Sequence, residues 1–152
     1  MTPQEIQLIR SSFNLLATDS ATVARDFYRS LFEMDPGLRT LFDSDLEAQG
    51  KKLMQMLALV VNGLDRFDEL VPALHLLGQR HGRYGVRRYD FHTVGTALLA
   101  TLRACLGDAY TEDAHAAWAN AYGLLAREMR VSMGDGDTEV AEFWASAGAQ
   151  AS

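Results

Sequence analysis

Apolar side chains recur every three or four residues along almost the whole chain. The clearest stripes are Ile6, Ile9, Phe13 and Leu16; Val23, Phe27, Leu31 and Phe32; Leu53, Met56, Leu57, Val60 and Val61; Phe91, Val94, Leu98 and Leu102; and Trp118, Tyr122, Leu125 and Met129. This spacing places each set on one face of an α-helix. No segment alternates as a strand does. The pattern predicts an all-α protein with six to seven helices and short connections.

Local signals indicate where these helices begin and end. Residues 2–5, TPQE, form a capping box with proline in the first turn, and Ser20 is expected to cap a second helix. Asp35 precedes a proline, which disfavours the helical conformation, so the second helix should end there. The remaining expected elements are a helical turn at 36–42 and helices at 46–65, from about 68 to 81, at 90–106 and from 111. We expect one domain, 1–133, followed by an acidic, alanine-rich tail, 134–152.

His81 lies on an apolar helix face near a helix end. At about 100° per residue, Leu70, Leu74 and Leu77 fall within about 40° of it. His75 falls about 120° away and points elsewhere. Such a histidine is most often a satisfied core residue, but it is also a suitable axial ligand for a buried metal or haem. This stretch of sequence alone leaves both interpretations of His81 open.

Composition and charge restrict the possible partners and the cellular location of the protein. The net charge of −6 and the isoelectric point near 5.1 argue against nucleic acid or an anionic membrane as the main partner. No apolar run reaches the roughly 20 residues of a membrane span, and no basic, apolar leader begins the sequence, so we expect a cytoplasmic protein. The single cysteine, Cys105, excludes an intrachain disulfide and a CxxCH haem attachment. Its place near the Val94 stripe predicts a buried thiol.

Two polar side chains interrupt the apolar stripes, whereas the common enzyme motifs are missing. Tyr28 lies among apolar neighbours, and Gln49 precedes Leu53 by one turn. Each alone is unremarkable, because buried tyrosines usually find local partners. Together with His81 they suggest a haem pocket that offers an imidazole on one side and a phenol and an amide to a diatomic gas on the other. No histidine precedes His75, so the N-terminal half supplies no second imidazole.

The sequence resembles a bacterial single-domain globin. The matching stretches are FYRSLF (27–32), DP (35–36), LF (41–42), KLMQ (52–55), LGQRH (77–81), YGV (84–86), VG (94–95), AW (117–118) and AYG (121–123). The family it resembles includes the globin domain of flavohaemoglobins, the Vitreoscilla haemoglobin and neuroglobin, and the chain is most similar to the Hell's Gate type of thermophile globin. The resemblance implies a globin fold packed around haem b.

The resemblance also implies a role for each matching residue. His81 aligns with the proximal histidine that binds iron, Phe42 with the phenylalanine that wedges the haem, and Tyr28 with the distal tyrosine. Gln49 and Leu53 align with the distal polar residue and the leucine one turn later, whereas a register shifted by three would place Lys52 there. The haem walls and propionate contacts are then expected from Leu77, Val86, Val94 and Arg80.

Two departures from flavohaemoglobins bear on function. Phe91 and Met133 stand where those proteins carry a tyrosine and a glutamate behind the proximal histidine, and the flavin and nicotinamide domains have no counterpart. We expect reversible, high-affinity binding of O₂, and of NO or CO, at a five-coordinate ferrous haem. The alternatives are a nitric oxide dioxygenase served by an external reductase and, third, a gas sensor. An apolar stripe in the tail, with Phe143 and Trp144, is a candidate homodimer contact.

Overall fold

The computed structural model describes residues 1–42, 45–83 and 86–133, apart from the side chains of residues 81–83 and 88. Within that part the chain forms six α-helices and four short 3-10 helices, with no strand. The all-α prediction is therefore confirmed. The predicted tail, 134–152, lies outside the described residues.

The helices follow the predicted order closely. They are α1 (Pro3–Leu16), α2 (Ser20–Met34), α3 (Leu46–Gly63), α4 (Phe67–Arg83), α5 (Arg88–Leu106) and α6 (Glu112–Val131), with 3-10 helices η1 (Ala17–Asp19), η2 (Pro36–Leu41), η3 (Leu64–Arg66) and η4 (Gly107–Ala109). The capping box at the start of α1 is present, because Thr2 and Glu5 each accept a hydrogen bond from the other's backbone N–H. Asp19, not Ser20, caps α2.

Helix α5 begins two residues earlier than the sequence pattern predicts. The Asp90 carboxylate accepts hydrogen bonds from the backbone N–H of Arg87 at 2.8 Å and from its guanidinium at 2.9 Å. This arrangement satisfies an N–H at the start of the helix, where no intrahelical acceptor exists. Asp90 itself is 2% exposed, so the pair anchors the helix start within the protein.

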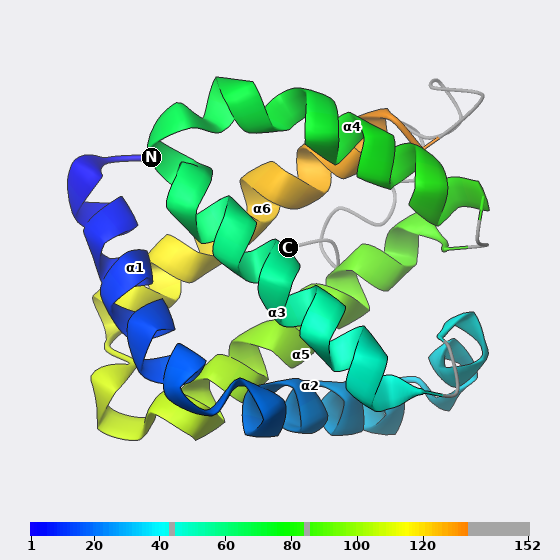
Figure 1. The fold of residues 1–152 in the computed structure, drawn as a ribbon, viewed down its shortest axis with the longest axis horizontal. Helices are drawn as coiled ribbons and strands as arrows, with labels where there is room; N and C mark the ends of the chain where they lie inside the picture. The colour runs from blue at the N-terminus through cyan, green and yellow to red at the C-terminus, as the bar shows by residue number, and fades with distance from the viewer. Residues whose placement is uncertain (43–44, 84–85, 134–152) are drawn as a thin grey trace.

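The helices pack in two crossing layers (Figure 1). Helix α3 crosses the front of the view, α4 runs along the top and α2 along the bottom, with α5 and α6 behind. Helices α3 and α4 join at one corner through η3, where a Cβ on Gly63 would lie 2.9 Å from the Leu70 side chain. From that corner the two helices diverge.

Two glycines allow close helix crossings. A Cβ on Gly50 would lie 2.9 Å from the Ala24 Cβ, which brings α3 against α2. A Cβ on Gly95 would lie 2.5 Å from the ring of Tyr122, which brings α5 against α6. The Tyr122 hydroxyl also donates to the backbone oxygen of Phe91 at 2.6 Å. The crossing positions are thus set by the absence of a side chain on one partner.

Cys105 is exposed, so the prediction of a buried thiol is wrong. Its Sγ lies 3.8 Å from a carboxylate oxygen of Asp26. Burial and the Asp26 carboxylate raise the pKa of the Cys105 thiol. Leu102, one turn earlier, is buried, whereas Arg103 and Ala104 are exposed, so the last turn of α5 extends past its covered part.

A buried hydrogen bond joins α6 to α1. The Trp118 indole N–H donates to the Ser12 hydroxyl at 2.8 Å, and both side chains are 4% exposed.

We predict that Ser12→Ala lowers the free energy of unfolding by about 1–3 kcal/mol, because the indole N–H is left buried without an acceptor. Denaturant unfolding measures this. Ser11→Ala, on the exposed side of α1, is the matched control, and an equal loss in both variants would contradict the prediction.

Candidate functional site

Four aromatic side chains gather where α2 meets the residues that follow η2. The Tyr28 ring lies 5.2 Å from Phe27, 5.9 Å from Phe32 and 5.4 Å from Phe42, measured between centroids. Phe32 and Phe42 are themselves 5.6 Å apart. Tyr28 is 5% exposed, whereas Phe42 is half-buried. Two of the residues predicted for the site, 14 positions apart in the sequence, are therefore in contact.

The Tyr28 hydroxyl has no hydrogen-bond partner among the described residues. Burial raises the pKa of this phenol to about 12. The side chain consequently stays neutral at ordinary pH and retains its proton as a donor. The Tyr28 oxygen is not among the fully buried, unpartnered side-chain atoms of the described residues, where only His92 Nδ1 is found, so the hydroxyl is not sealed off by protein. Such a group is available to a ligand.

Arg39 is a contributor that the sequence reasoning missed. Its guanidinium carbon lies 5.7 Å from the centroid of the Phe32 ring, and Nη1 donates to the backbone oxygen of Phe42 at 3.4 Å. The first contact holds η2 against α2, and the second fixes the backbone at the end of η2. The only sequence signal is a basic residue three positions before Phe42, which is too common to be informative.

The close crossing of α2 and α3 positions the other predicted distal residues. Gly50 packs on Ala24, one helical turn before Tyr28, so Gln49 and Leu53 lie within a turn of the crossing. Both side chains are half-buried. Lys52 is exposed, and its solvated position favours the register with Gln49 over the alternative.

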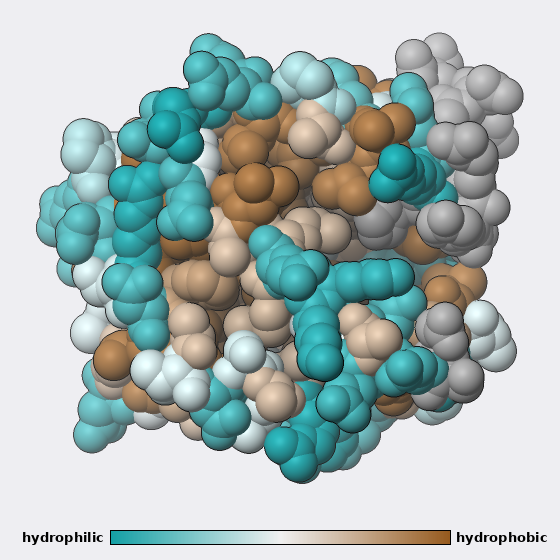
Figure 2. Space-filling model, in the orientation of Figure 1, coloured by the Kyte–Doolittle hydropathy of each residue, from teal (hydrophilic) through white to brown (hydrophobic). Residues whose placement is uncertain are grey.

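Helix α4 carries the predicted iron ligand. His81 lies in its last turn, but its side chain is outside the described residues. Leu74 is buried and Leu77 half-buried, while Arg80 is exposed. Val86 and Val94 are also half-buried, and Figure 2 shows apolar surface gathered between α4 and α3. The diverging helices thus leave apolar side chains incompletely covered by protein.

Several other polar groups near these helices already have protein partners, whereas the buried Nδ1 of His92 on α5 has none among the described residues. His75 Nε2 lies 3.1 Å from a Glu128 carboxylate oxygen, and His115 Nδ1 lies 2.8 Å from the Tyr110 hydroxyl. Arg87 pairs with Asp90, whose hydrogen bond raises the pKa of the guanidinium. These side chains serve as links within the protein.

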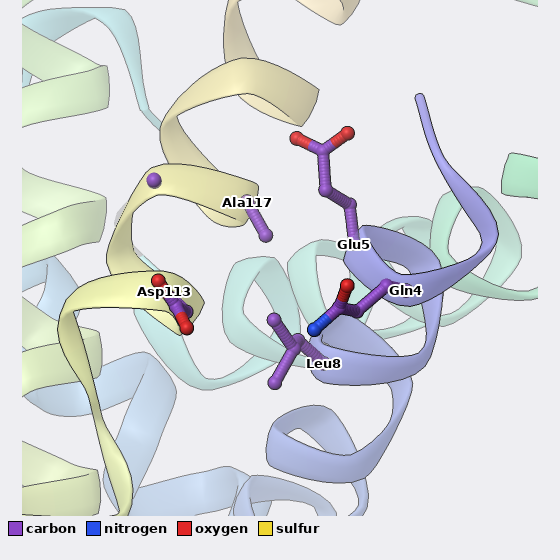
Figure 3. Close-up of a pocket in the computed structure, with 6 residues that line it drawn as sticks. Gln4, Glu5, Leu8, Asp113 and Ala117 are labelled. Carbon is purple, nitrogen blue, oxygen red and sulfur yellow. The ribbon is translucent and has the colours of Figure 1, made fainter.

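Two surface pockets lie elsewhere. Figure 3 shows the first, of about 230 Å³, where Gln4 and Leu8 of α1 lie opposite Asp113 and Ala117 of α6. Its Glu5 carboxylate is already occupied by the Thr2 backbone N–H and the Asn120 amide. The second, of about 310 Å³, is lined by Phe13, Ala17, Ser20, Lys51, Met54, Gln55 and Ala58. Neither includes a predicted site residue.

Comparison with known families decides the classification. The Globin family profile matches residues 25–129. The chain belongs to the globin family. That range contains the aromatic cluster, Gln49, Leu53 and His81, so it covers the residues predicted for the site.

Curated relatives agree with this classification. The chain is 32% identical over 130 residues to a flavohemoprotein of Chromobacterium violaceum and 30% identical over 129 residues to one of Bordetella parapertussis. A flavohemoprotein of Vibrio cholerae is 27% identical over 130 residues. These matches cover 83–84% of this globin and 32–33% of the relatives, so the chain spans about a third of their length.

Membership of the globin family implies that the protein binds haem and small gas ligands. The described residues fit such a group. The half-buried apolar side chains of α3, α4 and α5 offer an incompletely covered apolar surface, and Tyr28 offers a donor without a local partner. Among the described residues, no helix combines the length and the apolarity needed to cross a membrane.

The raised pKa of Tyr28 predicts a pH dependence of stability. An ordinary tyrosine ionises near pH 10, so between pH 10 and about 12 the unfolded chain releases a proton that the folded state keeps. The contribution is fully present below pH 10 and is lost as pH rises toward 12. We predict that, between about pH 9 and about pH 11, the free energy of unfolding measured in denaturant falls less in Tyr28→Phe than in the wild type.

Tyr89→Phe is the matched control, because Tyr89 is among the exposed large side chains. It should keep the alkaline loss of the wild type. An unchanged pH dependence in Tyr28→Phe would contradict the prediction.

Proposed function

We propose that this globin binds O₂ and other diatomic gases reversibly and with high affinity at a haem b held by His81. The hydroxyl of Tyr28, a residue that is 5% exposed and lies beside Phe42, carries the proposal, because it has no hydrogen-bond partner among the described residues. A donor that stays neutral and unpaired is suited to a small polar ligand.

We assign different side chains to different parts of the haem. We assign the axial imidazole to His81, the wedge to Phe42 and the apolar walls to Leu53, Leu77, Val86 and Val94. Arg80, exposed on α4, is assigned to the propionates. Haem, when bound, supplies an iron that takes up one gas molecule. The half-buried apolar surface excludes water from the position that the gas molecule takes up.

Tyr28 and Gln49 determine the gas affinity in this proposal. The phenol keeps its proton because burial raises its pKa to about 12, so it donates at every physiological pH. A hydrogen bond with charge-assisted character in a dry pocket contributes about 1–3 kcal/mol. Gln49 adds an amide donor from the start of α3. Because O₂ becomes more polar than CO on binding to haem, these donors favour O₂.

The ferrous haem is five-coordinate in this proposal. All four histidines lie at position 75 or later. His75 and His115 are engaged with Glu128 and Tyr110, His92 lies on α5, and α2 and α3, which carry the proposed distal residues, have no imidazole. Glutamine binds iron poorly, so the distal side stays open to gas.

A nitric oxide dioxygenase is the second candidate, favoured by the similarity to flavohemoproteins. It converts NO and O₂ to nitrate and needs electrons from a reductase. Both functions require the same distal donors. Catalytic consumption of NO with a reductase and reduced nicotinamide distinguishes them, since a carrier consumes NO only once per haem.

The assignment of His81 is tested by substitution. We predict that His81→Ala loses stable haem binding, recovered only with added imidazole, because the other histidine of α4, His75, is paired with Glu128. His75→Gln should keep a five-coordinate ferrous spectrum. Absorption spectra of the ferric, ferrous and CO forms measure both. Haem loss in His75→Gln with retention in His81→Ala would refute the assignment.

The distal donors are tested by the rate of O₂ release. We predict that Tyr28→Phe, which removes one hydroxyl at nearly constant volume, raises the O₂ dissociation rate about ten- to a hundredfold and changes CO release far less. Gln49→Leu should have a smaller effect, because a half-buried side chain also reaches solvent. Stopped-flow displacement measures both rates.

Lys52→Ala is the matched control for α3, because Lys52 is exposed. It should leave O₂ release unchanged. A large effect of Lys52→Ala together with none of Tyr28→Phe would mean that the distal register is shifted by three residues. Unchanged O₂ release in both Tyr28→Phe and Gln49→Leu would refute the high-affinity proposal.

A further inference from the structure

The end of α6 lies directly against α4 at Gly78, one turn before His81. A Cβ on Gly78 would overlap the backbone oxygen of Met129 and the hydroxyl of Ser132. Gly78 is buried. The Met129 oxygen belongs to the helix backbone and cannot rotate away as a flexible side chain does. No residue larger than glycine therefore fits here without moving one helix.

A second link joins the same two helices one turn earlier. His75 Nε2 lies 3.1 Å from Glu128 Oε1, and the Glu128 side chain is only 17% exposed. On the α6 side, the Ser132 hydroxyl donates to the Met129 oxygen at 3.0 Å, so that carbonyl is held in place. His75 and Gly78 are three residues apart and lie on one face of α4. Together the two contacts fix both the distance and the rotation of α4 on α6.

We propose that Gly78 is a positioning residue for His81, and that the His75–Glu128 hydrogen bond supports it. This inference rests on the proposed role of His81 as the iron ligand. His81 follows Gly78 by three residues on a continuous helix, so a shift or rotation of α4 at Gly78 moves the His81 backbone with it. The close approach at Gly78 thereby sets the position of the backbone from which His81 is proposed to bind iron.

Gly78→Ala tests the proposal in the haem-loaded protein. We expect a shifted iron–histidine stretching band in the resonance Raman spectrum of the ferrous form. Haem loss to an apomyoglobin acceptor should become about ten- to a hundredfold faster, the size expected from overpacking. Gly123→Ala is the matched control on α6, because a Cβ there would meet nothing within 4 Å. It should change neither quantity.

A second variant keeps the test decisive if Gly78→Ala does not fold. Glu128→Ala removes the hydrogen bond to His75 and should shift the same band and speed haem loss to a smaller extent. Glu69→Ala is its control, because Glu69 lies on α4 with its side chain 76% exposed and should leave both unchanged.

The outcomes separate the positioning role from the proposed function. If Gly78→Ala lowers only the unfolding midpoint and leaves the Raman band and the rate of haem loss as in Gly123→Ala, while His81→Ala loses haem, the positioning role alone is refuted. If Gly78→Ala is unfolded, a Glu128→Ala variant identical to Glu69→Ala refutes it. Normal haem retention in His81→Ala refutes the proposed iron ligand, and the positioning role with it.

Discussion

The fold depends on close contacts between helices at positions that carry no side chain. Gly50 lets α3 approach Ala24 of α2, Gly95 accommodates the Tyr122 ring, and Gly78 lies against the Met129 carbonyl. At Gly78 the approach is limited by the Met129 carbonyl, a backbone group that does not yield as a flexible side chain does, whereas at Gly50 and Gly95 it is limited by the Ala24 Cβ and the Tyr122 ring. The crossings at Gly50 and Gly78 lie beside the residues assigned to the two sides of the haem. The geometry of the candidate site is therefore a consequence of helix packing.

The aromatic cluster around Tyr28 combines core packing with a free donor. The Tyr28 ring contacts Phe27, Phe32 and Phe42, whereas its hydroxyl has no acceptor among the described residues. A phenylalanine would make the same ring contacts without offering a donor. A tyrosine here is best explained by a ligand that accepts its hydrogen bond when the site is loaded.

Much of the fold could be predicted because the signals are local. Helical spacing of apolar residues, the capping box at Thr2 and the proline after Asp35 each act within a few residues, and the helices begin and end close to the predicted positions. The exposed Cys105 was mispredicted, because angular position on a helix says nothing about where the covering helix ends. Arg39 was missed because its value depends on Phe32 and Phe42 being brought together.

The sequence by itself determined the helical class, the order of the helices, the resemblance to globins and the two residues with the most specific context, His81 and Tyr28. Only the tertiary structure decided that Tyr28 contacts Phe42 and lacks a described partner, that Gln49 is half-buried while Lys52 is exposed, and that Gly78 lies against α6. Each of these facts joins segments far apart in the chain or depends on what covers a surface. Helical periodicity specifies the face on which a residue lies, whereas the identity of the neighbour across that face is a property of the packed fold.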